Sequence, residues 1–146
     1  MEPTALVDRF RLFLLVVAAG VCVGTPLELW LMEHTESPPQ ILPFILCALG
    51  LVMVVAVLVR PMHPTLWGLR VVMALVGLGS LFGMYEHFEH NLEFALEIRP
   101  NAVFGDVWFE ALRGASPLFA PGILALAALL AIAATYQHPL LRKPAR

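Results

Sequence analysis

Long apolar runs alternate with short polar connectors along the chain, and this alternation predicts membrane-spanning helices. A helix needs about 20 apolar residues to cross the hydrocarbon core of a bilayer. The apolar runs predict four such spans, over residues 10–32, 41–59, 66–85 and 117–136. The third run continues as a helix pattern to position 99, ahead of Pro100. We therefore expect an all-α membrane protein with four transmembrane helices in a compact bundle.

The polar connectors predict where the bundle is capped. The first connector, EHTESPPQ over residues 33–40, holds two prolines that end one helix and start the next. Residues 101–116 include GDVWFEALRG, which predicts a short amphipathic helix with Trp108 and Phe109 at headgroup level. We expect these segments and the end of the third helix to form a helical cap on the non-cytoplasmic side. The whole chain, 1–146, is predicted to be a single integral membrane domain.

Composition supports a membrane protein and argues against a soluble or a nucleic-acid-binding one. Hydrophobic residues make up 60% of the chain and charged residues 14%, with a mean hydropathy of +0.82, far from the average of soluble proteins. A net charge of -2 without a basic stripe argues against a nucleic-acid partner. Cys22 and Cys47 lie in apolar runs without a CxxC motif, where thiols are ordinary packing residues.

The Lys and Arg residues fall mostly on one side of the predicted membrane spans, and this asymmetry predicts how the chain is oriented in the membrane. Cytoplasmic flanks of membrane spans carry an excess of Lys and Arg. The cations on one side are Arg9, Arg11, Arg60, Arg70, Arg142, Lys143 and Arg146, while only Arg99 and Arg113 fall on the other. We expect both termini to be cytoplasmic, in a cell inner membrane, with the cap on the periplasmic side.

The chemistry-bearing residues concentrate between Gly79 and Pro100. At about 100° of rotation per residue, one stripe of this helix holds four polar side chains, Glu86, His90, Glu93 and Glu97, with Glu89 at its edge. The opposite side is apolar. This pattern is typical of a solvated acidic face or an interaction surface.

A metal site is the main alternative for these residues. Imidazole and carboxylate ligands suit divalent Zn, Fe or Cu. The candidate ligands are Glu28, His34, Glu86, His87, His90 and Glu93. His87 points about 100° away from Glu86 on an ideal helix, so all six cannot bind one ion. No second helix repeats a Glu-x-x-His pattern, which argues against a di-iron centre.

Two GxxxG pairs predict a helix contact. Gly20 and Gly24 lie in the first span and Gly79 and Gly83 in the third, and such pairs let helices approach closely in lipid. This contact would direct Glu28 toward the acidic stripe. In the alternative, Glu28 lies near the headgroups, hydrogen-bonded to Gln40 or paired with Arg99 or Arg113.

Four segments together resemble a group of small four-helix bacterial inner-membrane proteins of unknown function. They are ELWLMEHTESPPQILPFIL, HNLEFALEIRP, ALRGASPLFAPGIL and YQHP. The resemblance implies the topology and a set of positions to test, Glu28, His34, Gln40, His90, Asn91, Glu93 and Glu97. It implies no catalytic role.

These observations favour a non-enzymatic function. We expect a structural or accessory membrane protein whose acidic, His-bearing cap binds a membrane or periplasmic protein. A periplasmic-side metal-binding protein or metalloenzyme is the first alternative. A small-cation channel or transporter is the second, and it requires a homo-oligomer because four short spans line little of a path.

Overall fold

The computed structural model describes residues 3–141, and within this range every regular element is a helix. In chain order the elements are α1 (Pro3–Leu31), α2 (Pro38–Val59), α3 (His63–Ile98), α4 (Phe104–Ala111), α5 (Gly122–Ala134) and the 3-10 turn η1 (Pro139–Leu141). The all-α prediction is thus confirmed for the described residues. The predicted short helix near Trp108 is α4.

Three helices, α1, α2 and α3, are long and apolar enough to cross a membrane. The continuation of the third span is confirmed, since α3 is one helix of 36 residues and therefore about 54 Å long at 1.5 Å per residue. A bilayer's hydrocarbon core is only about 30 Å thick. One end of α3 must consequently extend beyond it.

The helix predicted over 117–136 is shorter than expected. Only α5 is helical there, and its 13 residues make a rod of about 20 Å. Residues 118–121 form turns instead. Pro121 explains the late start, because proline lacks the N–H that a helix interior requires and disfavours helical backbone at the preceding residue.

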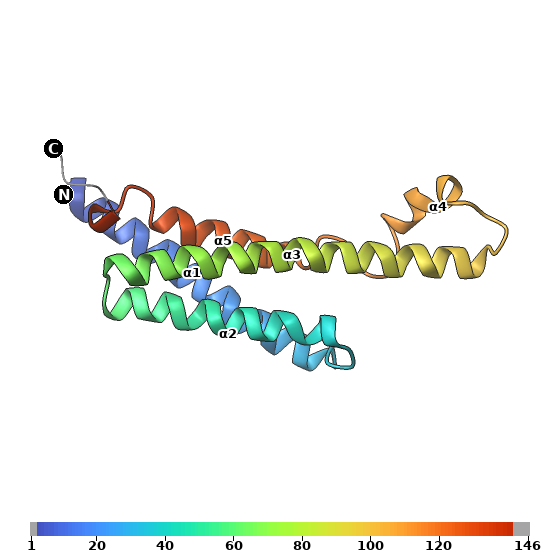
Figure 1. The fold of residues 1–146 in the computed structure, drawn as a ribbon, viewed down its shortest axis with the longest axis horizontal. Helices are drawn as coiled ribbons and strands as arrows, with labels where there is room; N and C mark the ends of the chain where they lie inside the picture. The colour runs from blue at the N-terminus through green and yellow to red at the C-terminus, as the bar shows by residue number, and fades with distance from the viewer. Residues whose placement is uncertain (1–2, 142–146) are drawn as a thin grey trace.

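The four longest helices pack in a ring (Figure 1). α1 lies against α2 and α5, and α3 also lies against α2 and α5, so α1 and α3 are diagonal to each other. The predicted GxxxG contact between the first and third spans is therefore wrong. Nothing stands within 4 Å of where a Cβ of Gly20 or Gly24 would be.

Small residues instead bring α3 close to its two real neighbours. A Cβ on Gly77 would lie 3.7 Å from Ala128 of α5, one on Gly83 would lie 3.1 Å from Pro121, and Gly79 faces Leu46 of α2. Close backbone approach of this kind is how helices associate in lipid. Large apolar side chains cover the outside of the ring, as lipid contact requires.

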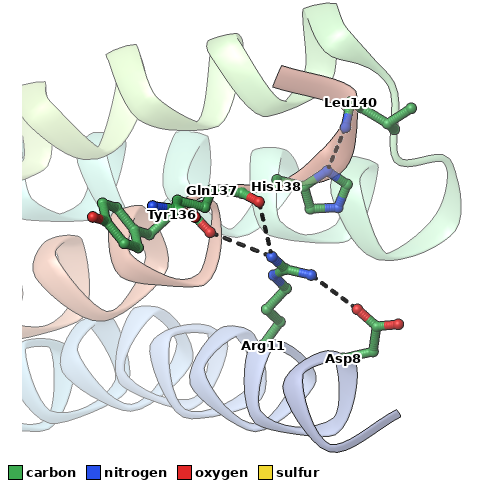
Figure 2. Close-up of polar contacts among 6 residues, drawn as sticks. All are labelled: Asp8, Arg11, Tyr136, Gln137, His138 and Leu140. Atoms are coloured by element: carbon green, nitrogen blue, oxygen red, sulfur yellow. Dashed lines mark hydrogen bonds and ion pairs between the residues drawn. The ribbon is translucent and has the colours of Figure 1, made fainter. Parts of the chain in front are cut away.

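The end of the ring at which the described chain begins and ends is tied together by two arginines. Arg11 of α1 donates to the carbonyl oxygens of Tyr136 and Gln137, both at 3.3 Å, and pairs with Asp8 (Figure 2). Arg70 donates to the Thr135 hydroxyl at 2.7 Å and to its carbonyl oxygen at 3.0 Å. Cations are favourable at a helix C-terminus, where carbonyl groups lack partners. The two side chains thus anchor the end of α5.

Candidate functional site on the projecting part of α3

The outer part of α3 extends past the other long helices (Figure 1). α2 begins at Pro38, and only α4 lies beside the far end of α3. We call residues 86–98 of α3, together with α4, the projecting arm. It carries most of the candidate residues.

Asn91 holds the arm together. Its side-chain nitrogen donates to the carbonyl oxygens of Ala111 at 3.0 Å and Ser116 at 2.8 Å, and its oxygen accepts the Ser116 backbone N–H at 2.9 Å. The side chain is 3% exposed. A buried amide with both donor hydrogens and its acceptor used is fully compatible with a folded core. Asn91 therefore attaches the chain after α4 to α3.

Gly114 permits this attachment. A Cβ at Gly114 would stand 2.6 Å from the Asn91 Cβ and closer still to its Cγ and Oδ1. Real Cβ atoms do not approach other atoms this closely. The backbone can run over the Asn91 amide only because residue 114 has no side chain.

Two further side chains of α3 bind the same irregular segment. His87 Nδ1 lies 2.8 Å from the Pro117 carbonyl oxygen, and the Ser80 hydroxyl donates to the Pro121 carbonyl oxygen at 2.7 Å. Residues 80, 87 and 91 share one side of a helix with 3.6 residues per turn. This row adds side-chain hydrogen bonds to the backbone between residues 111 and 121, where the Pro117 and Pro121 oxygens also accept the N–H groups of Ala120 and Leu124. Such satisfaction is essential wherever irregular backbone lies near lipid.

The acidic stripe lies on a different side of α3. Glu86 and Glu89 are half-buried, whereas His90, Glu93 and Glu97 are exposed. Tyr85 lies near enough to Glu89 for the two side chains to interact. Among residues 3–141 no ion pair joins this stripe to a cation. The stripe is thus an open, negatively charged surface.

Two arginine side chains contact α4 at the far end of the arm. Arg99, directly after α3, pairs with Glu110 of α4, and the Arg113 guanidinium lies 4.3 Å from the centre of the Phe109 ring. Phe94, Ala95 and Ile98 border a pocket of about 190 Å³ between α3 and α4. Phe94 and Ile98 are 53% and 64% exposed, respectively.

His34 reaches the same region from the first connector. α1 ends in a Schellman motif, in which the His34 N–H binds the Leu29 carbonyl oxygen at 2.9 Å and Glu33 adopts a left-handed φ of 56°. The pKa of His34 is lowered, first by desolvation and then by the charge of His87. These two histidines are therefore near enough to interact.

Within residues 3–141 the six candidate metal ligands are not gathered into one group. Within the described part of the chain, no three His, Cys, Asp or Glu side chains are grouped so that they could hold a metal ion. His87 binds a backbone carbonyl, and Glu28 lies exposed on α1. The residue pattern suggested ligands because it cannot show how α1 and α3 are placed.

The partners expected for Glu28 near the headgroups are also engaged elsewhere. Gln40 Oε1 accepts the backbone N–H groups of Glu36 at 2.7 Å and Ser37 at 3.2 Å, which caps α2. Arg99 and Arg113 contact α4 residues, as described above. Gln40 and Arg99 are therefore structural residues of their own elements.

The sequence did not reveal the importance of Ser80, Glu110, Gly114 or Ser116. Their partners lie between 11 and 41 positions away along the chain. No local motif marks such pairs. The prolines at positions 117 and 121 are the sequence signal that the backbone there is irregular and needs hydrogen-bond partners from other segments.

No protein-family model, curated protein or solved structure matches the chain. The resemblance to small bacterial inner-membrane proteins therefore stays a prediction.

Proposed function

We propose that this chain is a multi-pass inner-membrane protein of accessory type whose projecting arm binds a protein partner through the acidic stripe. One observation carries the proposal: the stripe is uncovered, while the same helix is fixed on another side by Asn91 and His87. A surface that is held rigid before binding loses less conformational entropy on association.

We infer four membrane passes, the fourth made by residues 117–136. Three helices can each span the membrane, and Arg11 links the first helix to Gln137, so the described chain starts and ends at the same end of the ring. An even number of passes is needed to return there. The short helix α5 and the turns before it supply the return pass, with Ser80 and His87 satisfying the irregular backbone.

We infer that the arm lies on the non-cytoplasmic side. Arg9, Arg11, Arg60 and Arg70 gather at the other end of the ring, where the described chain begins and ends, and the positive-inside rule places that end in the cytoplasm. In a bacterium the arm would then face the periplasm.

The chemistry of the arm indicates what the partner offers. The stripe presents four carboxylates, Glu86, Glu89, Glu93 and Glu97, and the exposed side chains of Phe94 and Ile98 border the pocket between α3 and α4. Electrostatic complementarity favours a basic surface and speeds association, while apolar anchors contribute affinity. The partner we infer is a protein segment that combines Lys or Arg with exposed apolar side chains.

The test begins with site-specific crosslinking in cells. A photo-reactive amino acid at Glu93 should form a crosslink, and mass spectrometry should identify a crosslinked peptide that is basic. The same peptide should then bind the purified full-length chain in detergent. Changing both Glu93 and Glu97 to Lys should weaken binding roughly tenfold or more, because close like charges oppose association.

The matched control is Glu36→Lys, which reverses a charge in the first connector. This control should leave the affinity for the peptide unchanged. A peptide without basic residues, or equal affinity for the doubly changed chain, would refute the proposal. Loss of binding on adding a metal chelator would favour the metal-binding alternative.

Neither alternative function gains support from the described residues. The metal-binding alternative lacks a group of ligands. The cation channel requires a homo-oligomer, in which Glu28, exposed on α1, would have to line a path between chains.

A further inference from the structure

Two cysteine thiols meet in the core of the helix ring. Cys22 of α1 is 2% exposed and Cys47 of α2 is 0% exposed, and both are free cysteines. Their thiols lie near enough to interact with each other. They come from adjacent helices and from positions 25 residues apart in the chain, so they form a pair only in the folded protein.

A third sulfur lies beside this pair because Gly50 has no side chain. The point at which a Gly50 Cβ would stand is 3.3 Å from Cys22 Sγ and 3.7 Å from Met73 Sδ. Met73 belongs to α3 and is 0% exposed. α1 and α3 are diagonal, and Gly50 of α2 leaves space between Cys22 of α1 and Met73 of α3.

The surroundings of the three sulfurs are apolar. Cys22, Cys47 and Met73 belong to one core cluster with residues such as Ala18, Val54 and Ala128. Cys47 lies about 18 Å along the helix axis from the end of α2 at Val59, and Met73 lies about 15 Å from the start of α3 at His63. This is near the middle of a hydrocarbon core about 30 Å thick.

We propose that Cys22, Cys47 and Met73 form a binding site for Cu(I), a soft monovalent metal ion. The proposal is independent of the partner-binding function and of the histidines on the arm. Thiolate and thioether ligands select Cu(I), whereas Mg²⁺ and Ca²⁺ require oxygen ligands. A structural zinc site needs four ligands, and three sulfurs do not supply them.

Charge also favours a monovalent ion here. Burying an uncompensated charge in an apolar core is very costly. Binding of Cu⁺ replaces the proton of one thiol: one S–H bond breaks, one S–Cu bond forms, and the proton leaves to solvent. The Met73 thioether donates a lone pair without losing a proton, and the second thiol keeps its proton and can donate a hydrogen bond to the metal-bound thiolate. No electron is transferred, and the loaded site is neutral.

Met73 is suited to completing the coordination. Methionine has three rotatable side-chain bonds and a polarisable sulfur, so the proposal requires only that the thioether reach the metal by a change of rotamer. Gly50 is a positioning residue for the site. A methyl group there would stand 3.2 Å from Met73 Cε and 3.3 Å from Cys22 Sγ.

The experiment titrates the full-length chain in detergent, reduced and metal-free, with Cu(I) in competition with a chromophoric Cu(I) chelator. We expect one Cu(I) per chain and an X-ray absorption spectrum with sulfur as the only ligand. Cys22→Ala should abolish competitive binding. Met73→Leu conserves volume and should weaken binding about tenfold, as loss of a supporting group does at metal sites.

Two control variants make the outcome specific. Met53→Leu changes another methionine between α2 and α3, one that faces Gly68 rather than the thiols, and should leave Cu(I) affinity unchanged. His87→Gln should also leave it unchanged. Thermal unfolding of each variant in the absence of metal shows whether the fold is retained.

Several outcomes would overturn the proposal. One is the absence of stoichiometric Cu(I) binding to the unmodified chain. A second is a spectrum that shows nitrogen ligands. A third is a Cu(I) affinity of the folded Cys22→Ala and Cys47→Ala variants that equals the affinity of the unmodified chain. Formation of a Cys22–Cys47 disulfide in air with no Cu(I) bound under reduction would also exclude the site.

Discussion

Asn91 and Ser116 bind each other in both directions. The Asn91 side-chain nitrogen donates to the Ser116 carbonyl oxygen at 2.8 Å, and the Ser116 backbone N–H donates to Asn91 Oδ1 at 2.9 Å. With the further bond to Ala111, one side chain of α3 satisfies three backbone groups of the chain after α4. The position of that chain depends on this amide.

Replacing Asn91 with Leu should release the segment after α4. Leucine has a similar volume but leaves three backbone groups without partners, and such unsatisfied groups cost about 1 to 3 kcal/mol each when buried. We expect faster amide hydrogen exchange between residues 111 and 121. His90→Leu, on an exposed position one residue earlier, serves as control and should leave that exchange unchanged. Equal exchange in both variants would contradict the role of Asn91.

Gly114→Ala tests the close approach to Asn91. The new methyl group would overlap the Asn91 side chain, and relief of such overpacking typically costs about 1 to 3 kcal/mol. The control is Gly105→Ala in α4, where nothing lies within 4 Å. We expect Gly114→Ala to lower the protection of residues 111–121 against proteolysis and Gly105→Ala to preserve it. Equal protection would show that the backbone at residue 114 can move aside.

Glu33→Gly should stabilise the end of α1. Glu33 has a φ of 56°, and the left-handed region costs a non-glycine residue roughly 1 kcal/mol. The free energy of unfolding, measured by denaturant titration in detergent micelles, should rise by a similar amount. Glu36→Gly is the control, because Glu36 is not among the residues with positive φ. It should lower stability slightly by increasing the entropy of the unfolded chain.

Stability should fall on acidification through two histidines outside the membrane spans. The pKa of His138 is lowered by desolvation and then by the charge of Arg11, with Asp8 acting in the opposite direction. The pKa of His34 is lowered by desolvation and then by His87. A histidine with a lowered pKa binds fewer protons in the folded chain than in the unfolded chain. The free energy of unfolding therefore decreases as pH drops below the ordinary histidine value of 6.5.

Thermal unfolding of the chain in detergent at about pH 7.5 and about pH 5.5 measures this dependence. We expect a lower midpoint at the acid value. Replacing both His34 and His138 with Gln should reduce the difference between the two midpoints. His63→Gln provides a comparison at a histidine that lies at the start of α3. A difference that is unchanged in the double variant would assign the acid sensitivity to other groups.

Part of the candidate site followed from helix periodicity alone. The stripe of Glu86, His90, Glu93 and Glu97 was predicted from their spacing, and α3 is the single continuous helix that this spacing assumed. Three of these side chains are exposed and Glu86 is half-buried. The role of Asn91 was not predicted, because its partners are 20 and 25 positions away. Periodicity describes one helix and contains no information on the segment that packs against it.

The amino-acid sequence by itself determined the class of the protein, the approximate extents of α1, α2 and α3, and the acidic character of the arm. These properties depend on local composition and on the length of apolar runs, which the cost of placing polar groups in lipid constrains strongly. Only the tertiary structure decided which helices are neighbours. It turned Gly20 and Gly24 away from α3, gave His87 a backbone partner, and placed Cys22 and Met73 beside Gly50. These arrangements arise from packing between segments far apart in the chain, where side-chain volume and hydrogen-bond satisfaction act together.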